Sequence, residues 1–237
     1  MVKSELAGTL QHKTGFLWLL LVPVFICILV WRDSEQSKKP AIVQLAEAPS
    51  SLSLQFMAAS DSAFSYRLVL FWLQQFDVQS GQYISYRQLD YQKLTDWLEA
   101  LSVLEPESQY PLLLAARVYS RVADTEKVRT VLAYIFKKFL QNADKNWRWL
   151  AEATVIARHT LKDQPLALKY ATALADSSSS EIPHWARDIR LIILEDMGEV
   201  EQVKLLVGAL VASKTVTDAN EIRFLEILMQ RLQNKDK

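Results

Sequence analysis

Few residues of this 237-residue chain have the side chains and spacing that catalysis or metal binding requires. The histidines are His12, His159 and His184, and no two of them are four positions apart, the spacing that places two ligands on one helix face. The only cysteine, Cys27, lies in an apolar segment, so residues 32–237 supply no thiolate ligand and no disulfide. We therefore expect neither a metal nor a cofactor.

His159 is the strongest candidate for acid–base chemistry, because an imidazole titrates near neutral pH. The pattern around it indicates a helix end, where Arg158, His159 and Lys162 complement the negative terminus. The alternative is a small membrane-tethered enzyme with a site between helices around His159, aided by Glu152 or Asp163. No recognisable motif ties a nucleophile or carboxylate to His159, so we expect no enzyme activity.

Two further patterns lack the geometry of a catalytic site. Glu195 and Asp196 are adjacent, and adjacent side chains on a helix point about 100° apart, so these carboxylates do not converge on one substrate. The five glycines are scattered at positions 8, 15, 81, 198 and 208, which excludes a phosphate-binding glycine loop. Nucleotide-dependent chemistry is therefore not expected.

The charge balance indicates the class of partner. The formal net charge is zero, and removing residues 1–31 leaves 25 basic and 26 acidic residues. A nucleic-acid surface needs a marked basic excess, so we expect a protein partner and no nucleic acid. Lys127, Arg129, Lys137 and Lys138 share one expected helix. They form either a basic face for an acidic partner or lipid headgroups, or the solvated side of an amphipathic helix.

The elements that must position these residues begin with an apolar segment. Residues 15–31, GFLWLLLVPVFICILVW, are 17 residues without a charge, and a helix would extend them over about 25 Å, near the lower limit for crossing a bilayer. Trp18 and Trp31 fall where the headgroup interfaces would lie. A cleaved signal peptide needs small residues where the charged run RDSE begins at Arg32. We expect an uncleaved transmembrane anchor after a tail of residues 1–14.

The orientation of this anchor rests on little charge asymmetry. Lys3 and Lys13 precede the anchor, and Arg32, Lys38 and Lys39 follow it. A short N-terminal tail and a cysteine-free domain favour an exported domain. The expected location is a bacterial inner membrane, crossed once, with the domain on the periplasmic side.

The remaining chain is expected to be a tether and an all-α domain. Residues 32–53 mix charges, serines and two prolines, which predicts a flexible tether. Residues 54–237 show apolar residues at helical spacing. A first helix is expected at 61–76, with Asp61 as N-cap and Phe64, Leu68, Phe71, Trp72 and Phe76 as its apolar residues. A loop should follow at 79–89, and a second helix at 90–104 should stop before Pro106.

An internal repeat organises the rest of this domain. The segments 110–140, 147–175 and 184–213 start 37 positions apart, and each reads as two amphipathic helices joined near Asp124, Asp163 or Gly198. Small or apolar residues recur at the same offsets in the three segments: Ala116, Tyr119, Val128, Leu132 and Ile135; Thr154, Ala157, Leu166, Tyr170 and Ala173; Leu191, Leu194, Val203, Val207 and Leu210.

These offsets resemble those of the tetratricopeptide repeat family. The resemblance covers about residues 90–213 and implies an α–α superhelical array, with hairpins at about 61–106, 109–141, 146–176 and 183–214 and a capping helix at 218–233. The period exceeds the usual 34, and bulky Leu191 stands where a small residue is typical. Such repeats share an architecture and not an activity.

Aromatic residues near the starts of successive hairpins suggest a binding surface. Trp, Tyr and Arg often anchor interfaces, so the candidate protein-binding groove consists of Tyr110, Arg117, Trp147, Arg148, Trp149, Trp185, Arg187 and Arg190. The alternative is that the aromatic residues only pack between repeats. The sequence thus predicts a membrane-anchored, non-enzymatic scaffold or adaptor that binds a partner protein, in the assembly of a membrane or envelope complex. A purely structural, oligomerising subunit is the other alternative.

Overall fold

The computed structural model describes residues 22–28, 45–76, 88–213 and 216–235, and within these ranges the regular elements are all helices. The all-α class is therefore confirmed. The chain divides into two compact units; residues 22–28 are the described part of the first, and the second begins at Gln44. The helices of the second unit are α2 Ser51–Gln75, α3 Tyr91–Leu104, α4 Tyr110–Arg117, η2 Tyr119–Arg121, α5 Thr125–Gln141, α6 Ala143–His159, α7 Gln164–Asp176, α8 His184–Met197, α9 Val200–Ser213 and α10 Ala219–Lys235.

The predicted anchor falls only partly on described residues. Residues 22–28 are helical with exposed side chains, and the rest of 15–31 lies outside the described ranges, as do the tail 1–14 and residues 32–44 of the expected tether. Among the described residues, the structure contains no helix that is both long enough and apolar enough to cross a bilayer.

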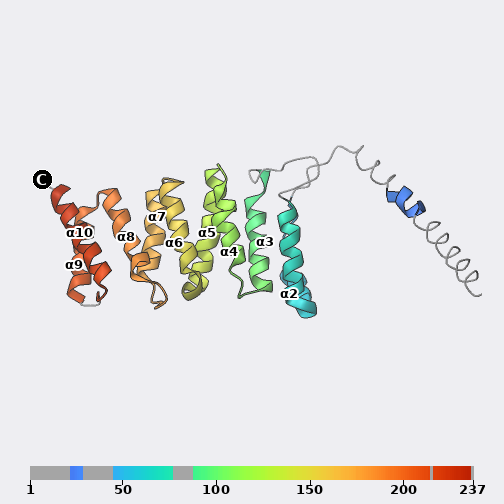
Figure 1. Cartoon of the computed structure of the whole chain (residues 1–237), viewed down its shortest axis with the longest axis horizontal. Coiled ribbons are helices and arrows are strands. Elements are labelled where there is room, and N and C mark those ends of the chain that lie inside the picture. The colour runs from blue at the N-terminus through green and yellow to red at the C-terminus, as the bar shows by residue number, and fades with distance from the viewer. Residues whose placement is uncertain (1–21, 29–44, 77–87, 214–215, 236–237) are drawn as a thin grey trace, which may run out of the picture. The chain divides into compact units, whose positions relative to one another are not determined.

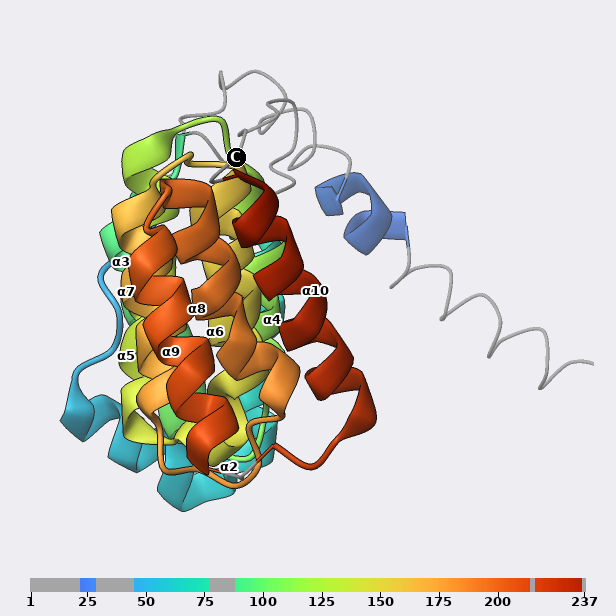
Figure 2. The ribbon, with the colours of Figure 1, turned by 90° about the vertical axis from the view of Figure 1, so that its left-hand side faces the viewer.

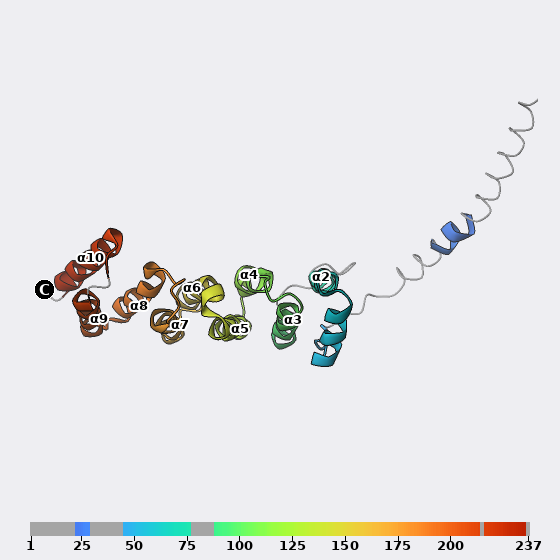
Figure 3. The same cartoon turned by 90° about the horizontal axis from the view of Figure 1, so that it is seen from below.

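Consecutive helices of the second unit pack on one another in chain order (Figure 1). α3 also packs on α5, and α4 packs on α6, so each helix pair contacts the next pair. Seen from below, α3, α5 and α7 lie in one layer, and α4 and α6 lie in another (Figure 3). This succession buries the apolar side of each pair against its neighbour.

Acidic and amide side chains begin most of these helices. Asp90, Asp124 and Asp218 each accept two backbone N–H bonds in the first turn of α3, α5 and α10, and Asn142 and Asp163 each accept one at α6 and α7. Such N-caps satisfy donors that have no partner within the helix. The predicted starts of α3 and α10 are confirmed within one residue.

The repeat offsets identify inward positions. Among these positions Leu166, Ala173 and Leu210 are partly buried, and the others are buried. The main core runs from Leu45 to Ile193, and a second cluster is formed by α8, α9 and α10, which lie together at the C-terminal end of the second unit (Figure 2). Small residues such as Ala116 and Ala157 are completely buried, so neighbouring helices approach closely.

The helix expected at 61–76 begins ten residues earlier than predicted. α2 starts at Ser51 and is interrupted at Asp61, whose φ of −161° and ψ of 102° are not helical. Asp61 accepts the Phe64 N–H, as predicted for an N-cap, but a further helical segment precedes it. Phe64 and its apolar neighbours Leu68 and Phe71 are exposed.

The expected tether overlaps the packed domain. Leu45 is buried, and the Trp97 indole N–H donates to the Ala46 carbonyl at 2.9 Å. Glu47 pairs with Lys93 at 2.8 Å. Residues 45–53 therefore belong to the domain, because these contacts hold them on α3, and the predicted boundary at 54 is too late.

Two other predicted features either differ in the structure or lie outside the described residues. In the hairpin expected at 109–141, α4 has only eight residues before the 3-10 turn η2, so its first helix is about two turns long. Most of the loop expected at 79–89 lies outside the described ranges, which resume at residue 88.

Candidate functional site

Three of the predicted groove residues come together at the start of α6 and α8. Trp147 is only 8% exposed, whereas Trp185 is 59% exposed, and their ring centroids lie 5.6 Å apart at 67°. The Arg148 guanidinium lies 5.2 Å from the Trp147 ring centroid, within cation–π range. Two successive hairpins thus present one aromatic edge, of which Trp185 is the exposed part.

Three other predicted groove residues contact neighbouring helices. The Tyr110 hydroxyl accepts a hydrogen bond from Gln74 at 3.1 Å, and Arg117 pairs with Glu152 at 3.3 Å. The Trp149 indole N–H donates to the Gln109 side-chain oxygen. These contacts favour the alternative in which the aromatic residues Tyr110 and Trp149 only pack between helices.

The last two predicted groove residues hold the connection between α7 and α8. The Arg187 side chain donates to four backbone carbonyls, those of Ala175, Ser177, Ser179 and Ile182. Arg190 pairs with Asp176 at the end of α7, at 2.8 Å. Arg187 therefore satisfies carbonyls at the end of α7, which lack intrahelical partners, and Arg190 pairs with the last side chain of that helix.

Trp185 also lines a groove that the sequence analysis did not identify. This groove has a volume of about 630 Å³, lies between α8 and α10, and is mostly apolar. Its lining residues are Pro183, His184, Trp185, Asp188, Ile189, Ile192, Asp218, Asn220, Glu221 and Phe224. On α8, Trp185, Ile189 and Ile192 follow the i, i+4, i+7 spacing of one helix face.

Two buried carboxylates lie in this groove. Asp188 is 8% exposed and Glu221 is 7% exposed. The pKa of Asp188 is raised to about 6, chiefly by burial and also by the negative charge of Glu221, while the nearby His184 opposes the rise. His184 Nδ1 lies 3.2 Å from Glu221 Oε2, an ion-pair distance, but the contact lacks hydrogen-bond geometry.

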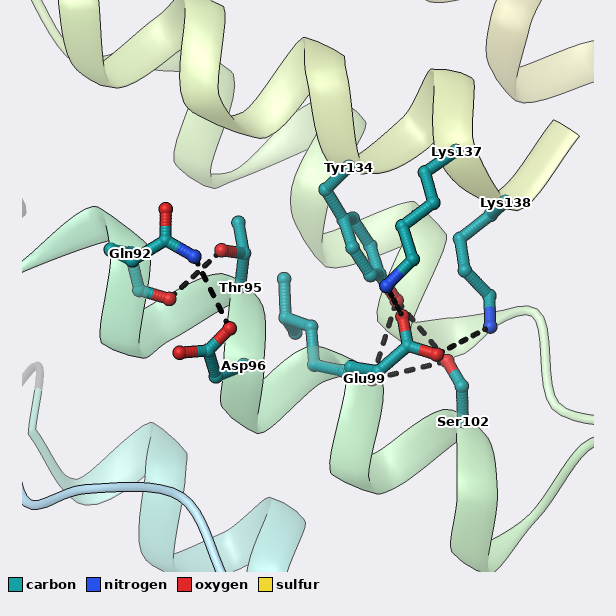
Figure 4. A network of polar contacts seen from close by, with 9 residues as sticks. Gln92, Thr95, Asp96, Glu99, Ser102, Tyr134, Lys137 and Lys138 are labelled. Atoms are coloured by element: carbon teal, nitrogen blue, oxygen red, sulfur yellow. Dashed lines mark hydrogen bonds and ion pairs between the residues drawn. The ribbon is translucent and has the colours of Figure 1, made fainter. Parts of the chain in front are cut away.

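A second polar cluster lies between α3 and α5, and its side chains contact one another within the domain (Figure 4). Glu99 lies 3.5 Å from Lys137 and 3.3 Å from Lys138, and the Tyr134 hydroxyl lies 3.1 Å from that of Ser102. Burial raises the pKa of Tyr134. The shallow hollow beside this cluster holds only about 230 Å³. Its arrangement is that of a polar connection between two helices.

The four cations of the expected basic face make contacts within the same domain. Glu99 engages Lys137 and Lys138, Arg129 pairs with Asp163, and Lys127 lies over the Tyr91 ring at 5.4 Å. These contacts favour a structural role of the four cations over a basic face for an acidic partner or lipid headgroups.

The residues of the enzyme alternative do not converge. His159 is exposed at the end of α6, whereas Glu152 pairs with Arg117, and Asp163 caps α7 and pairs with Arg129. Glu195 and Asp196 also diverge, because Glu195 binds Arg231 of α10 and Asp196 binds Arg158 of α6. Within the part of the chain that the structure describes, no group of three His, Cys, Asp or Glu residues has the arrangement of a metal site.

Comparisons add no relative from which a role could be carried over. No protein-family model matches the chain, and searches of curated proteins and of solved structures gave no match. The functional argument therefore depends on the α8–α10 groove itself.

Proposed function

We propose that this protein is a membrane-anchored adaptor without enzyme activity that binds a segment of a partner protein in the α8–α10 groove. The observation that carries the proposal is the open, mostly apolar groove between α8 and α10, with the exposed ring of Trp185 in its wall. Grooves of roughly 300–1,000 Å³ accommodate small ligands or the anchoring side chains of a bound helix.

The wider setting of the groove supports an adaptor. The offsets shared by three hairpins resemble tetratricopeptide repeats, whose stacked pairs present binding surfaces. The uncharged segment 15–31 is the proposed anchor, in a bacterial inner membrane with the domain on the periplasmic side. Such an adaptor would hold its partner near the bilayer during assembly of a membrane or envelope complex.

Site-specific photocrosslinking in cells tests the proposal. The full chain would carry p-benzoylphenylalanine in place of Trp185 or, as a matched control, in place of Leu140, an exposed residue near the end of α5. We expect a discrete adduct with another protein at position 185 and none at 140. The same adducts at both positions, or none at 185, would contradict binding in the groove. A topology reporter fused after Lys237 tests the proposed orientation.

A second candidate function, oligomerisation, is favoured by an apolar hollow of about 370 Å³ between α9 and α10. Val211 and Ile222 line this hollow, and Leu205 on α9 and Ile227 on α10 are also exposed. Light scattering of the full chain in detergent would distinguish the two functions. A monomer would leave only the adaptor, whereas a dimer broken by Val211→Glu would favour a structural subunit.

A further inference from the structure

The floor and walls of the α8–α10 groove differ in chemistry. Trp185, Ile189, Ile192 and Phe224 provide apolar surface, while Asp188 and Glu221 are more than nine-tenths buried. A buried carboxylate is costly unless a donor or cation compensates it. The groove therefore combines apolar walls with two buried carboxylates.

The domain itself does not neutralise these two groups. Among the described residues, no side chain or backbone N–H donates a hydrogen bond to Asp188, and no Lys or Arg pairs with either carboxylate. The imidazole of His184 lies 3.2 Å from Glu221, but His184 is 57% exposed and the contact lacks hydrogen-bond geometry. Glu195, on the same helix as Asp188, does have an arginine partner in Arg231. The contrast marks Asp188 and Glu221 as acceptors that face an open space.

We propose that the segment bound in the α8–α10 groove carries a lysine or arginine among apolar residues, and that this cation lies between Asp188 and Glu221. The apolar neighbours of the cation pack on Trp185, Ile192 and Phe224. The inference rests on the proposed function, because it specifies the partner of the same groove. A lysine or arginine brings the positive charge that both carboxylates lack, and its aliphatic stem suits the apolar wall.

Selection from a random peptide library tests this chemistry on the full chain in detergent. Peptides would be selected on the wild type and then measured against Asp188→Asn, Glu221→Gln and Trp185→Ala. Glu226→Gln is the matched control, because Glu226 is an exposed carboxylate on the same helix α10 but outside this groove. Thermal melting of each variant checks that it remains folded, and the two amide substitutions preserve side-chain shape.

We expect groove-dependent peptides to share a basic residue flanked by apolar ones. Removing either carboxylate should lower the affinity of these peptides on the order of ten- to hundredfold, the range expected for a hydrogen bond to a charged group. Replacing the basic residue by citrulline or norleucine should weaken binding similarly in the wild type, with little further loss in the carboxylate variants.

The possible outcomes separate the two proposals. Peptides that need Trp185 but contain no basic residue would overturn the cation inference and leave the adaptor function standing. Failure to obtain any peptide sensitive to Trp185→Ala would count against both. Equal loss of binding with Glu226→Gln, or equal binding of free spermidine without an apolar segment, would also overturn the proposed recognition.

Discussion

Trp147 and Trp185 meet edge to face, although they belong to successive helix pairs and differ greatly in exposure. Trp147 fills space between pairs, so Trp147→Ala should lower the free energy of unfolding by about 3–5 kcal/mol. Trp185→Ala removes mainly one ring contact and should cost about 1 kcal/mol. Urea unfolding followed by circular dichroism measures both. Equal losses would show that Trp185 is a core residue and not part of an exposed binding edge.

The pH dependence of stability should depend on Asp188. Its pKa is raised to about 6 in the folded protein, so the folded state binds more protons than the unfolded state between about pH 4 and 6. The free energy of unfolding should therefore fall as pH rises through that window. Asp188→Asn should reduce the fall and make the protein more stable than the wild type at pH 7. Urea unfolding at several pH values measures the free energy of unfolding of both proteins.

The control for this titration is Glu226→Gln, which removes an exposed carboxylate from α10. Its pH profile should follow that of the wild type. A profile of Asp188→Asn that also follows the wild type would show that burial does not disfavour the ionised form of Asp188.

The sequence predicted the helices and the inward positions well because both depend on short-range patterns. Asp90 and Asp218 cap helices that were expected to start there, and Asp124 and Asp163, expected near turns, cap the helices that follow. Asp61 misled the prediction of α2, since an N-cap normally marks a helix start and here follows another helical segment.

The α8–α10 groove was missed because its two walls are separated along the chain. Residues 218–233 read as a solubilising cap, and no local pattern indicates that Glu221 and Phe224 face α8. One signal was available: Asp188 lies on the helix face of Trp185 and Ile192, where an acidic residue interrupts an apolar stripe. Arg187 and Arg190 were predicted to line a groove. In the structure Arg187 donates to backbone carbonyls, which carry no sequence signal, and Arg190 pairs with the Asp176 carboxylate.

Arg187 should be essential to the connection between α7 and α8. Its guanidinium donates to the carbonyls of Ala175 and Ser177 at 2.9 and 2.7 Å, and to those of Ser179 and Ile182. Arg187→Lys keeps the charge but loses the planar fork that reaches several acceptors. We expect a loss of about 2–3 kcal/mol in the free energy of unfolding, since hydrogen bonds to charged groups contribute about that much.

Arg148→Lys is the matched control for this substitution, because Arg148 is an exposed arginine that lies over the Trp147 ring. It should change the free energy of unfolding by less than about 1 kcal/mol. Similar losses in the two variants would show that the four carbonyl contacts of Arg187 add nothing specific.

The domain should require residues 45–50 for full stability. Leu45 is 2% exposed in the main core, and Ala46 accepts the Trp97 indole N–H. Leu45→Ala should therefore lower the free energy of unfolding by about 2–4 kcal/mol, as for other buried leucines. Leu52→Ala, at an exposed position of α2, should change it by less than about 0.5 kcal/mol. Urea unfolding of the full chain in detergent compares the two variants. Equal and negligible losses would show that residues 45–50 are a flexible tether. A leucine that does not pack on α3 contributes no free energy of unfolding that its replacement by alanine could remove.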